Sequence, residues 1–209
     1  MTWHCRPTAV LGMCVLSLTL MCTGFAVSAQ EKPRGHLLVI TGIGGEDYYG
    51  DLFNRWAVTL TQVATEQLGF ERKHVVYLGE RVDRAPGVIA GVSDKATILA
   101  AVESLGTRSR PGDRVVIVLI GHGTARGDRV LFNLPGPDLS AKELDDALEP
   151  LSDRALAVVN TAPSSGAFVQ HLSAPNRVVI AATSGGAENQ HTLFAAHFVD
   201  AFAEAGADA

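Results

Sequence analysis

The chain has 209 residues, and its 17 Lys and Arg against 22 Asp and Glu leave a formal net charge of −5 at pH 7. A mildly acidic chain with no basic cluster disfavours nucleic acid or an anionic membrane surface as a partner. All three cysteines lie before residue 30, so residues 30–209 have no thiol for a disulfide, a thiolate metal site or nucleophilic attack.

The first 29 residues predict a secretory signal peptide. Arg6 precedes an apolar segment over residues 9–27, which ends in the small-residue cleavage pattern Val27-Ser28-Ala29. A membrane anchor is the alternative, but polar residues and a glycine interrupt the segment and no basic flank follows it. We therefore expect cleavage after Ala29, a secreted or periplasmic product, and no stable membrane insertion once the signal is removed.

Residues 30–209 have the length of a single domain with a sizeable core. Short apolar runs predict strands over residues 36–41, 75–78, 114–121, 155–160 and 177–182. Helical spacing predicts helices after residue 51, after an N-cap at Ser93, after a capping box at 140–143, from about Gly166, and over 193–202. The chain stops just after this last helix, so a natural end and a C-terminal truncation both stay open.

This alternation predicts an α/β fold in which helices cover both faces of a mostly parallel sheet. In such sheets the working residues lie in the loops beyond the carboxyl ends of the strands. Three loops meet that condition: TGIGGEDYYGD, GHGTARGDR and TAPSSGAF, which begin at residues 41, 121 and 161.

The first loop links a strand to a helix through glycines but does not fit a nucleotide site. A dinucleotide fingerprint from Gly42 would place Asp47 where the third glycine belongs, and a P-loop from Gly45 would place Asp51 where lysine belongs. Acidic residues would also repel phosphate. A tight turn into a helix with Asp47 near its N-terminus is favoured.

The second and third loops carry the candidate site. His122 follows an apolar strand and has a glycine on each side, which suits general-base catalysis, although a locally bonded histidine at a strand end is the alternative. TAPSSG ends the strand expected beside it, and neighbouring strands lie about 4.8 Å apart. A nucleophile in this turn could therefore pair with His122.

These motifs resemble the legumain-type peptidases of the caspase-like clan, whose signature is a strand ending in His-Gly followed by a strand ending in Ala-Cys-x-Ser-Gly. The resemblance covers nearly all of residues 30–209, in the segments HLLVITGIGGEDYYGDLFNRWAVTL, VVIVLIGHG, NTAPSSGAF and VVIAATSGGAENQHTLFAAHF. It implies a caspase-like three-layer α/β sandwich and a peptidase ancestry, with no cofactor.

Position by position, the resemblance implies that His122 is the catalytic histidine and that the Gly123 backbone helps to hold the oxyanion. The nucleophilic cysteine corresponds to Pro163, which has neither a nucleophile nor an N–H donor. Gly50 and Asp51 fall where legumain has Arg-His, so the basic lining of the specificity pocket is not matched either. We therefore expect the fold to be kept and cysteine catalysis to be lost.

A serine could have taken over the reaction. Ala162-Pro163-Ser164-Ser165-Gly166 has the spacing of a nucleophile elbow, and Ser164 with His122 as its base would make a serine-dependent hydrolase. The favoured interpretation is that Ser164 and Ser165 cap the helix from Gly166, because a shift of one residue along a turn swings the side chain away.

The other polar residues predict no metal site. The six histidines after residue 30 are scattered and form no His-Glu-x-x-His pattern. His197 falls on an apolar helix face and is expected to be a core residue, whereas His171 and His191 are expected in solvent. Asp128, the only carboxylate near His122 in its loop, is expected to be a solvated turn residue. The interpretation is an exported, degenerate peptidase homologue that binds a peptide or protein segment.

Overall fold

The computed structural model describes residues 1–3, 32–126, 129–185 and 192–207, with side chains up to residue 204. The chain divides into two units, Met1–Glu31 and Lys32–Ala209, and the second contains every helix and strand described below. Residues 4–29 of the predicted signal peptide, Asp128 and His191 lie outside the described residues. No helix in the described part of the chain is long and apolar enough to cross a membrane.

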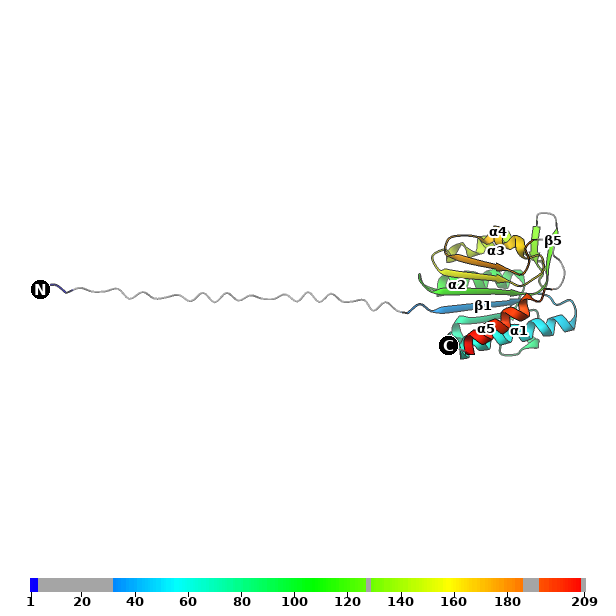
Figure 1. Cartoon of the computed structure of the whole chain (residues 1–209), viewed down its shortest axis with the longest axis horizontal. Coiled ribbons are helices and arrows are strands. Elements are labelled where there is room, and N and C mark those ends of the chain that lie inside the picture. The colour runs from blue at the N-terminus through cyan, green and yellow to red at the C-terminus, as the bar shows by residue number, and fades with distance from the viewer. Residues whose placement is uncertain (4–31, 127–128, 186–191, 208–209) are drawn as a thin grey trace. The chain divides into compact units, whose positions relative to one another are not determined.

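A six-stranded sheet forms the centre of the second unit, with every strand pairing parallel (Figure 1). The strand order is β3-β2-β1-β4-β8-β9. Its strands are β1 (Gly35–Thr41), β2 (Val75–Gly79), β3 (Gly91–Val92), β4 (Arg114–Ile120), β8 (Ala155–Asn160) and β9 (Arg177–Ala181). Five of them match the predicted runs to within a residue, because apolar runs with few polar interruptions are typical of strands that are buried on both faces.

Helices cover both faces of this sheet and make it the middle of three layers. The helices are α1 (Asp47–Glu66), α2 (Lys95–Arg108), α3 (Ala141–Leu148), α4 (Gly166–Leu172) and α5 (Phe194–Ala207), with short 3₁₀ turns η1 (Arg72–His74), η2 (Val82–Arg84) and η3 (Glu149–Leu151). One core cluster joins α2, α3 and α4 to the sheet, and the other joins α1 and α5 to its opposite face. The predicted three-layer α/β sandwich is confirmed.

The residues on either side of positions 127–128 form two paired antiparallel strands, which the sequence did not predict. Antiparallel strands β5 (Gly123–Arg126), β6 (Arg129–Phe132) and β7 (Leu139–Ser140) make a second, three-stranded sheet. Val130, Leu131 and Phe132 are buried, so β6 contributes to the core, whereas Arg126 and Arg129 at the far end of this sheet are exposed.

Two helix details correct the predictions. Ser93 does not cap α2: Asp94 is the N-cap and accepts a hydrogen bond from the Thr97 N–H, while the buried Ser93 hydroxyl donates to the Thr41 carbonyl at 2.6 Å. His197 is exposed and is not a core residue, because α5 turns Ala195 and Val199 toward the sheet. The capping box of Ser140 and Glu143 at α3 is confirmed.

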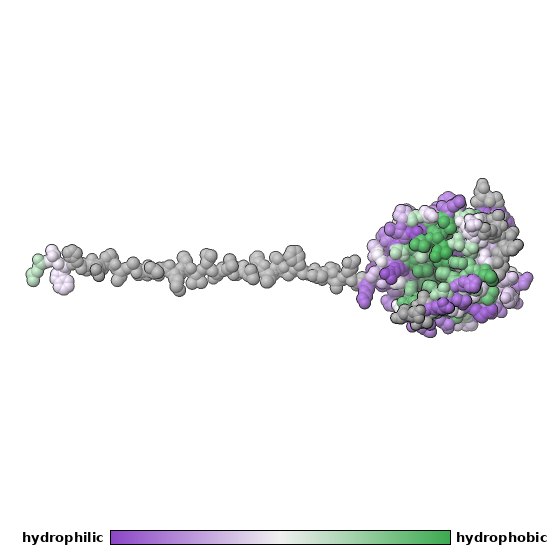
Figure 2. Space-filling view, in the orientation of Figure 1, coloured by the Kyte–Doolittle hydropathy of each residue, from purple (hydrophilic) through white to green (hydrophobic). Residues whose placement is uncertain are grey.

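Strand β9 at the edge of the large sheet stays only partly covered. None of its five residues is fully buried, and Val178 and Ile180 are 59% and 37% exposed. Figure 2 shows hydrophobic residues gathered on the face of the second unit that it presents. The buried strands β1, β4 and β8 therefore contribute more to the core than this edge does.

Candidate functional site

The carboxyl ends of β1 and β4 lie at the point where the strand order reverses, since β2 and β3 extend the sheet from β1 while β8 and β9 extend it from β4. Ligands bind at such switch points in open α/β sheets. The two ends are in close contact: the Gly42 N–H donates to the Ile120 carbonyl at 2.9 Å. A Cβ on Gly121 would lie 3.1 Å from the Gly42 backbone, which explains a glycine there.

His122 lies at this point, directly after β4, and is half-buried. Its Nε2 is 3.2 Å from the Gly44 carbonyl of the first loop. Tyr49 and Phe53 of α1 contact the imidazole edge-on, with ring centroids 5.1 and 5.2 Å away. Because a carbonyl only accepts, this hydrogen bond requires the proton on Nε2, and Nδ1 is then the basic nitrogen of the neutral ring.

Gly123 brings the histidine segment against the turn that follows β8. A Cβ on Gly123 would lie 2.2 Å from the Pro163 carbonyl oxygen and 3.4 Å from the Ala162 Cβ. Gly123 is therefore the residue that lets the two backbones approach. The loops predicted to meet do meet at the backbone of Gly123 and Pro163.

Pro163 is buried in this turn, and hydrogen bonds to strands β4 and β8 fix the residues that precede it. Both the N–H and the hydroxyl of Thr161 donate to the Leu119 carbonyl at 2.9 Å, and the Ala162 N–H donates to the Asn160 side chain at 3.1 Å. The pyrrolidine ring leaves Pro163 without an N–H and without a reactive side-chain atom. Chemically, this position can shape the turn but cannot attack a carbonyl.

Ser164 has φ +57°, a left-handed conformation that is uncommon outside glycine. Its side chain is fully buried, and its hydroxyl has no hydrogen-bond partner within the described ranges of the chain. Backbone strain of this kind clusters at functional sites and also at tight turns. The geometry therefore keeps Ser164 as a residue of interest but gives it no bond to His122.

The two serines do not cap α4 with their side chains, which corrects the predicted capping role. Ser165 is the N-cap residue but makes no side-chain capping bond, and its hydroxyl accepts from the Ala182 N–H at 2.9 Å. Thr183 takes over part of the role, because its hydroxyl accepts from the Gly166 N–H at 3.0 Å. The turn is thus tied to the segment after β9.

The first loop carries an ion-pair cluster that the sequence analysis missed. Arg84 of η2 pairs with Asp47 and Asp51 of α1 and lies 3.5 Å from Glu80. Its guanidinium lies against Gly50, where a Cβ would be 2.3 Å from Nη2. A basic group therefore does lie beside Gly50, but three carboxylates neutralise it. Only the local surplus of acidic residues could have suggested this cluster.

No cluster of three or more metal-ligating side chains exists among the residues that the structure describes. His171 is exposed in the last turn of α4, as predicted for a solvated residue, and does not join His122. The described part of the chain thus offers one histidine, a glycine backbone and a proline turn at the switch point.

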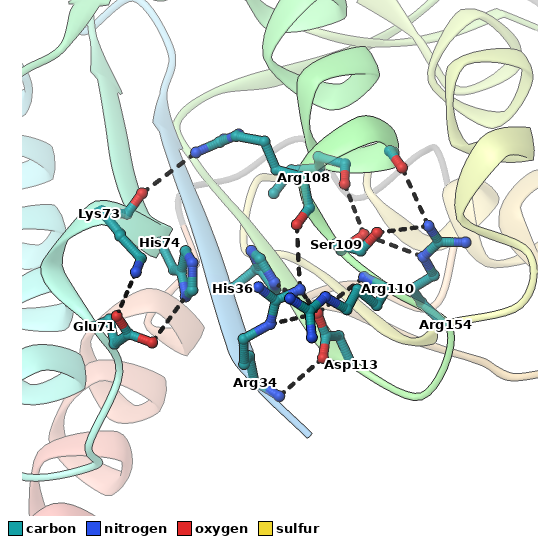
Figure 3. A network of polar contacts seen from close by, with 12 residues as sticks. Arg34, His36, Glu71, Lys73, His74, Arg108, Ser109, Arg110, Asp113 and Arg154 are labelled. Carbon is teal, nitrogen blue, oxygen red and sulfur yellow. Dashed lines mark hydrogen bonds and ion pairs between the residues drawn. The ribbon is translucent and has the colours of Figure 1, made fainter. Parts of the chain in front are cut away.

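A second titratable cluster lies at the opposite, amino-terminal end of β1 and β4 (Figure 3). Asp113 accepts hydrogen bonds from Arg34, from His36 and from the Arg110 N–H. The His36 ring packs on the ring of His74 of η1, with centroids 4.4 Å apart. These contacts tie η1 and the turn before β4 to β1, so the cluster supports the fold at the end of the sheet away from His122.

Replacing His74 with glutamine is expected to flatten the pH dependence of stability between pH 7 and 5. Burial lowers the pKa of His74 below its ordinary 6.5, and the neighbouring His36 lowers it further. As pH falls through about 6.5, the unfolded chain takes up this proton before the folded chain does, so the free energy of unfolding falls by up to about 1.4 kcal/mol per pH unit. Urea unfolding across this range measures the slope, and an unchanged slope in the variant would rule out His74 as its source.

No family model and no curated protein matches the sequence. The solved structures that resemble it include protein GSU0716 from Geobacter sulfurreducens, with 17% identity, 63% of this chain and 51% of that chain covered, and a TM-score of 0.44. They also include drICE, a caspase, with 14% identity, 84% and 76% of the two chains covered, and a TM-score of 0.49. The chain spans about half the length of the Geobacter protein.

Proposed function

We propose that the protein is an exported homologue of the legumain-type, caspase-like peptidases that has lost cysteine catalysis and binds a peptide or protein segment as a regulatory module. The observation that carries this proposal is Pro163, buried in the turn after β8 and in contact with Gly123 at the end of β4. A nucleophile belongs in this turn, beside the histidine that would activate it. Residues 30–209 contain no cysteine that could replace it.

Unsatisfied polar atoms at this edge support a role in binding. Of eight buried side-chain nitrogen or oxygen atoms without a partner among the described residues, four belong to Thr124, Asn133, Asn160 and Ser164. All four residues lie on segments that border His122, Gly123 or the Pro163 turn. Buried polar groups normally have partners, and a peptide backbone offers both donors and acceptors.

A serine-dependent peptidase or hydrolase is the second candidate, with Ser164 as nucleophile and His122 as base. The left-handed φ of Ser164, in a turn between a strand and a helix, favours it because nucleophile elbows have such strained turns. Against it, Ser164 is fully buried, and its hydroxyl has no bond to an activating base among the residues that the structure describes. Loss of catalysis therefore has the better support.

A fluorophosphonate probe separates the two candidates, because it labels an activated serine and not an ordinary one. We expect no labelling of the native protein and no cleavage of a mixed peptide pool above background, as read by mass spectrometry. Labelling that disappears in both Ser164→Ala and His122→Ala, but persists in Ser152→Ala, would establish the hydrolase and overturn the proposal. Ser152 is the matched control because it is exposed at the end of η3.

A further inference from the structure

A pocket on the second sheet, separate from the Pro163 turn, is lined by basic groups. It has a volume of about 280 Å³ and is lined by Arg129, Val130, Ser140, Ala141, Lys142 and His171. These come from β6, from the N-terminus of α3 and from the last turn of α4. Three of the six carry basic side chains, although the chain as a whole is acidic. We propose that this pocket binds an oxyanion, a phosphate or sulfate group carried by a small ligand.

A like-charge pair on strands β5 and β6 supports this proposal. Arg126 of β5 and Arg129 of β6 are directly opposite each other in the antiparallel register, and both are exposed. Side chains of directly opposed residues lie on the same face, where like charges destabilise the pair. Neither guanidinium forms a hydrogen bond or ion pair with any residue in the described part of the chain. A bound oxyanion would neutralise Arg129, which lines the pocket, and would reduce its repulsion of Arg126 on the neighbouring strand. Arginine pairs well with such groups.

The carboxylates of α3 are engaged with other cations. Glu143 binds Lys95 at 2.7 Å, Asp145 binds Arg177 at 2.7 Å, and Asp146 binds Lys142 at 2.8 Å. The carboxylates of α3 therefore do not pair with Arg126, Arg129 or His171. Lys142 is shared between Asp146 and the pocket, so it adds less positive charge than the arginines do.

The N-terminus of α3 adds backbone donors to the same pocket. In the capping box, Glu143 accepts from the Ser140 N–H at 2.9 Å, and Ser140 accepts from the Glu143 N–H at 3.2 Å. The box does not use the N–H groups of Ala141 and Lys142, the two pocket residues of the first helical turn, which have no intrahelical acceptor. Such N–H groups and the helix dipole favour an anion. Since one water takes about 30 Å³, the pocket has room for the oxyanion and part of the molecule that carries it.

Isothermal titration of the purified protein with inorganic phosphate, and separately with sulfate, tests the proposal at constant ionic strength set by sodium chloride. We expect saturable binding of at least one anion, weakened at least tenfold in Arg126→Gln/Arg129→Gln and measurably in His171→Gln. Arg55→Gln is the control, because Arg55 is an exposed arginine on α1 and does not line the pocket. This variant should bind the anion with the affinity of the native protein. Tighter phosphate binding would indicate a phosphorylated ligand, and tighter sulfate binding a sulfated one.

Three results would overturn the proposal: no saturable heat with either anion, equal heat on titrating chloride, or native affinity in the double variant. Circular dichroism and thermal melting show whether the variants fold. His171→Gln, a change at one exposed residue, keeps the test valid if the double variant does not fold. Peptidase or fluorophosphonate assays do not enter this test, so its outcome is independent of the function proposed for the Pro163 edge.

Discussion

Replacing Asp113 with alanine is expected to lower the free energy of unfolding by about 3 kcal/mol, a loss typical of breaking a buried ionic cluster by removing one partner. The Asp113 carboxylate is 5% exposed and accepts five hydrogen bonds: three from Arg34, one from His36 and one from the Arg110 N–H. Without it, the Nε2 of the buried His36 loses its partner, and the Arg34 guanidinium keeps only a long bond to the Arg108 carbonyl at 3.4 Å. We expect the lower end of the usual range because Arg34 stays 26% exposed and can bind water.

The same carboxylate makes the free energy of unfolding depend on pH in the acidic range. Burial by itself raises the pKa of Asp113, but the hydrogen bonds from Arg110, Arg34 and His36 outweigh it and hold the pKa well below the ordinary 3.8. Below about pH 4 the unfolded chain therefore takes up a proton that the folded chain does not, and the free energy of unfolding falls as pH drops. The stabilisation by the Asp113 carboxylate is fully present above that pH and is lost below it. The free energies of unfolding of the native protein and of Asp113→Ala should therefore converge as the solution becomes acidic.

Urea unfolding at pH 7 and at pH 3 to 4 measures both effects. Asp146→Ala is the matched control, since Asp146 pairs with Lys142 on the surface of α3 and both side chains are more than half exposed. It should change stability by less than about 0.5 kcal/mol. An Asp113→Ala loss as small as that of the control would mean that the cluster of Figure 3 does not stabilise the fold.

The large sheet could be predicted from the sequence because its evidence is local. A strand buried on both faces is a run of apolar residues, as in RVVIVLI of β4, and a capping box is a pair of residues three apart, as at Ser140 and Glu143. The meeting of Gly123 and Pro163 also follows, because parallel neighbouring strands end at the same edge. Each of these features depends on residues close in the chain or on the rules of strand pairing.

The errors occur where a distant residue decides the structure. Ser93 bonds the Thr41 carbonyl across the sheet, which leaves the cap of α2 to Asp94, and Thr183 bonds the first N–H of α4 in place of Ser165. His197 is exposed because the packing of α5 on the sheet, and not the apolar period alone, sets which side is buried. Strands β5 and β6 after His122 were not predicted, because a strand of four residues is too short to show a clear alternation of apolar and polar residues.

Replacing Gly123 with alanine is expected to destabilise the protein by about 3 kcal/mol, the upper end of the usual cost of overpacking. The new methyl group would lie 2.2 Å from the Pro163 carbonyl oxygen and 3.3 Å from the Leu131 carbonyl oxygen. Both are backbone atoms, so no rotamer change relieves the clash. Either the start of β5 or the Pro163 turn must move, and His122, the adjacent residue, would be displaced with it.

Gly91→Ala is the control, and its effect should have the opposite sign. A Cβ on Gly91 would meet only Leu78 and Thr97 at an ordinary 3.6 Å, and neither Gly91 nor Gly123 has a positive φ. The alanine restricts the unfolded chain without straining the folded one, so it should stabilise by up to about 1 kcal/mol. Thermal and urea unfolding of the two variants compare the effects directly. If Gly123→Ala were as stable as Gly91→Ala, the end of β4 would not touch the Pro163 turn, and the site would have to be sought elsewhere in the molecule.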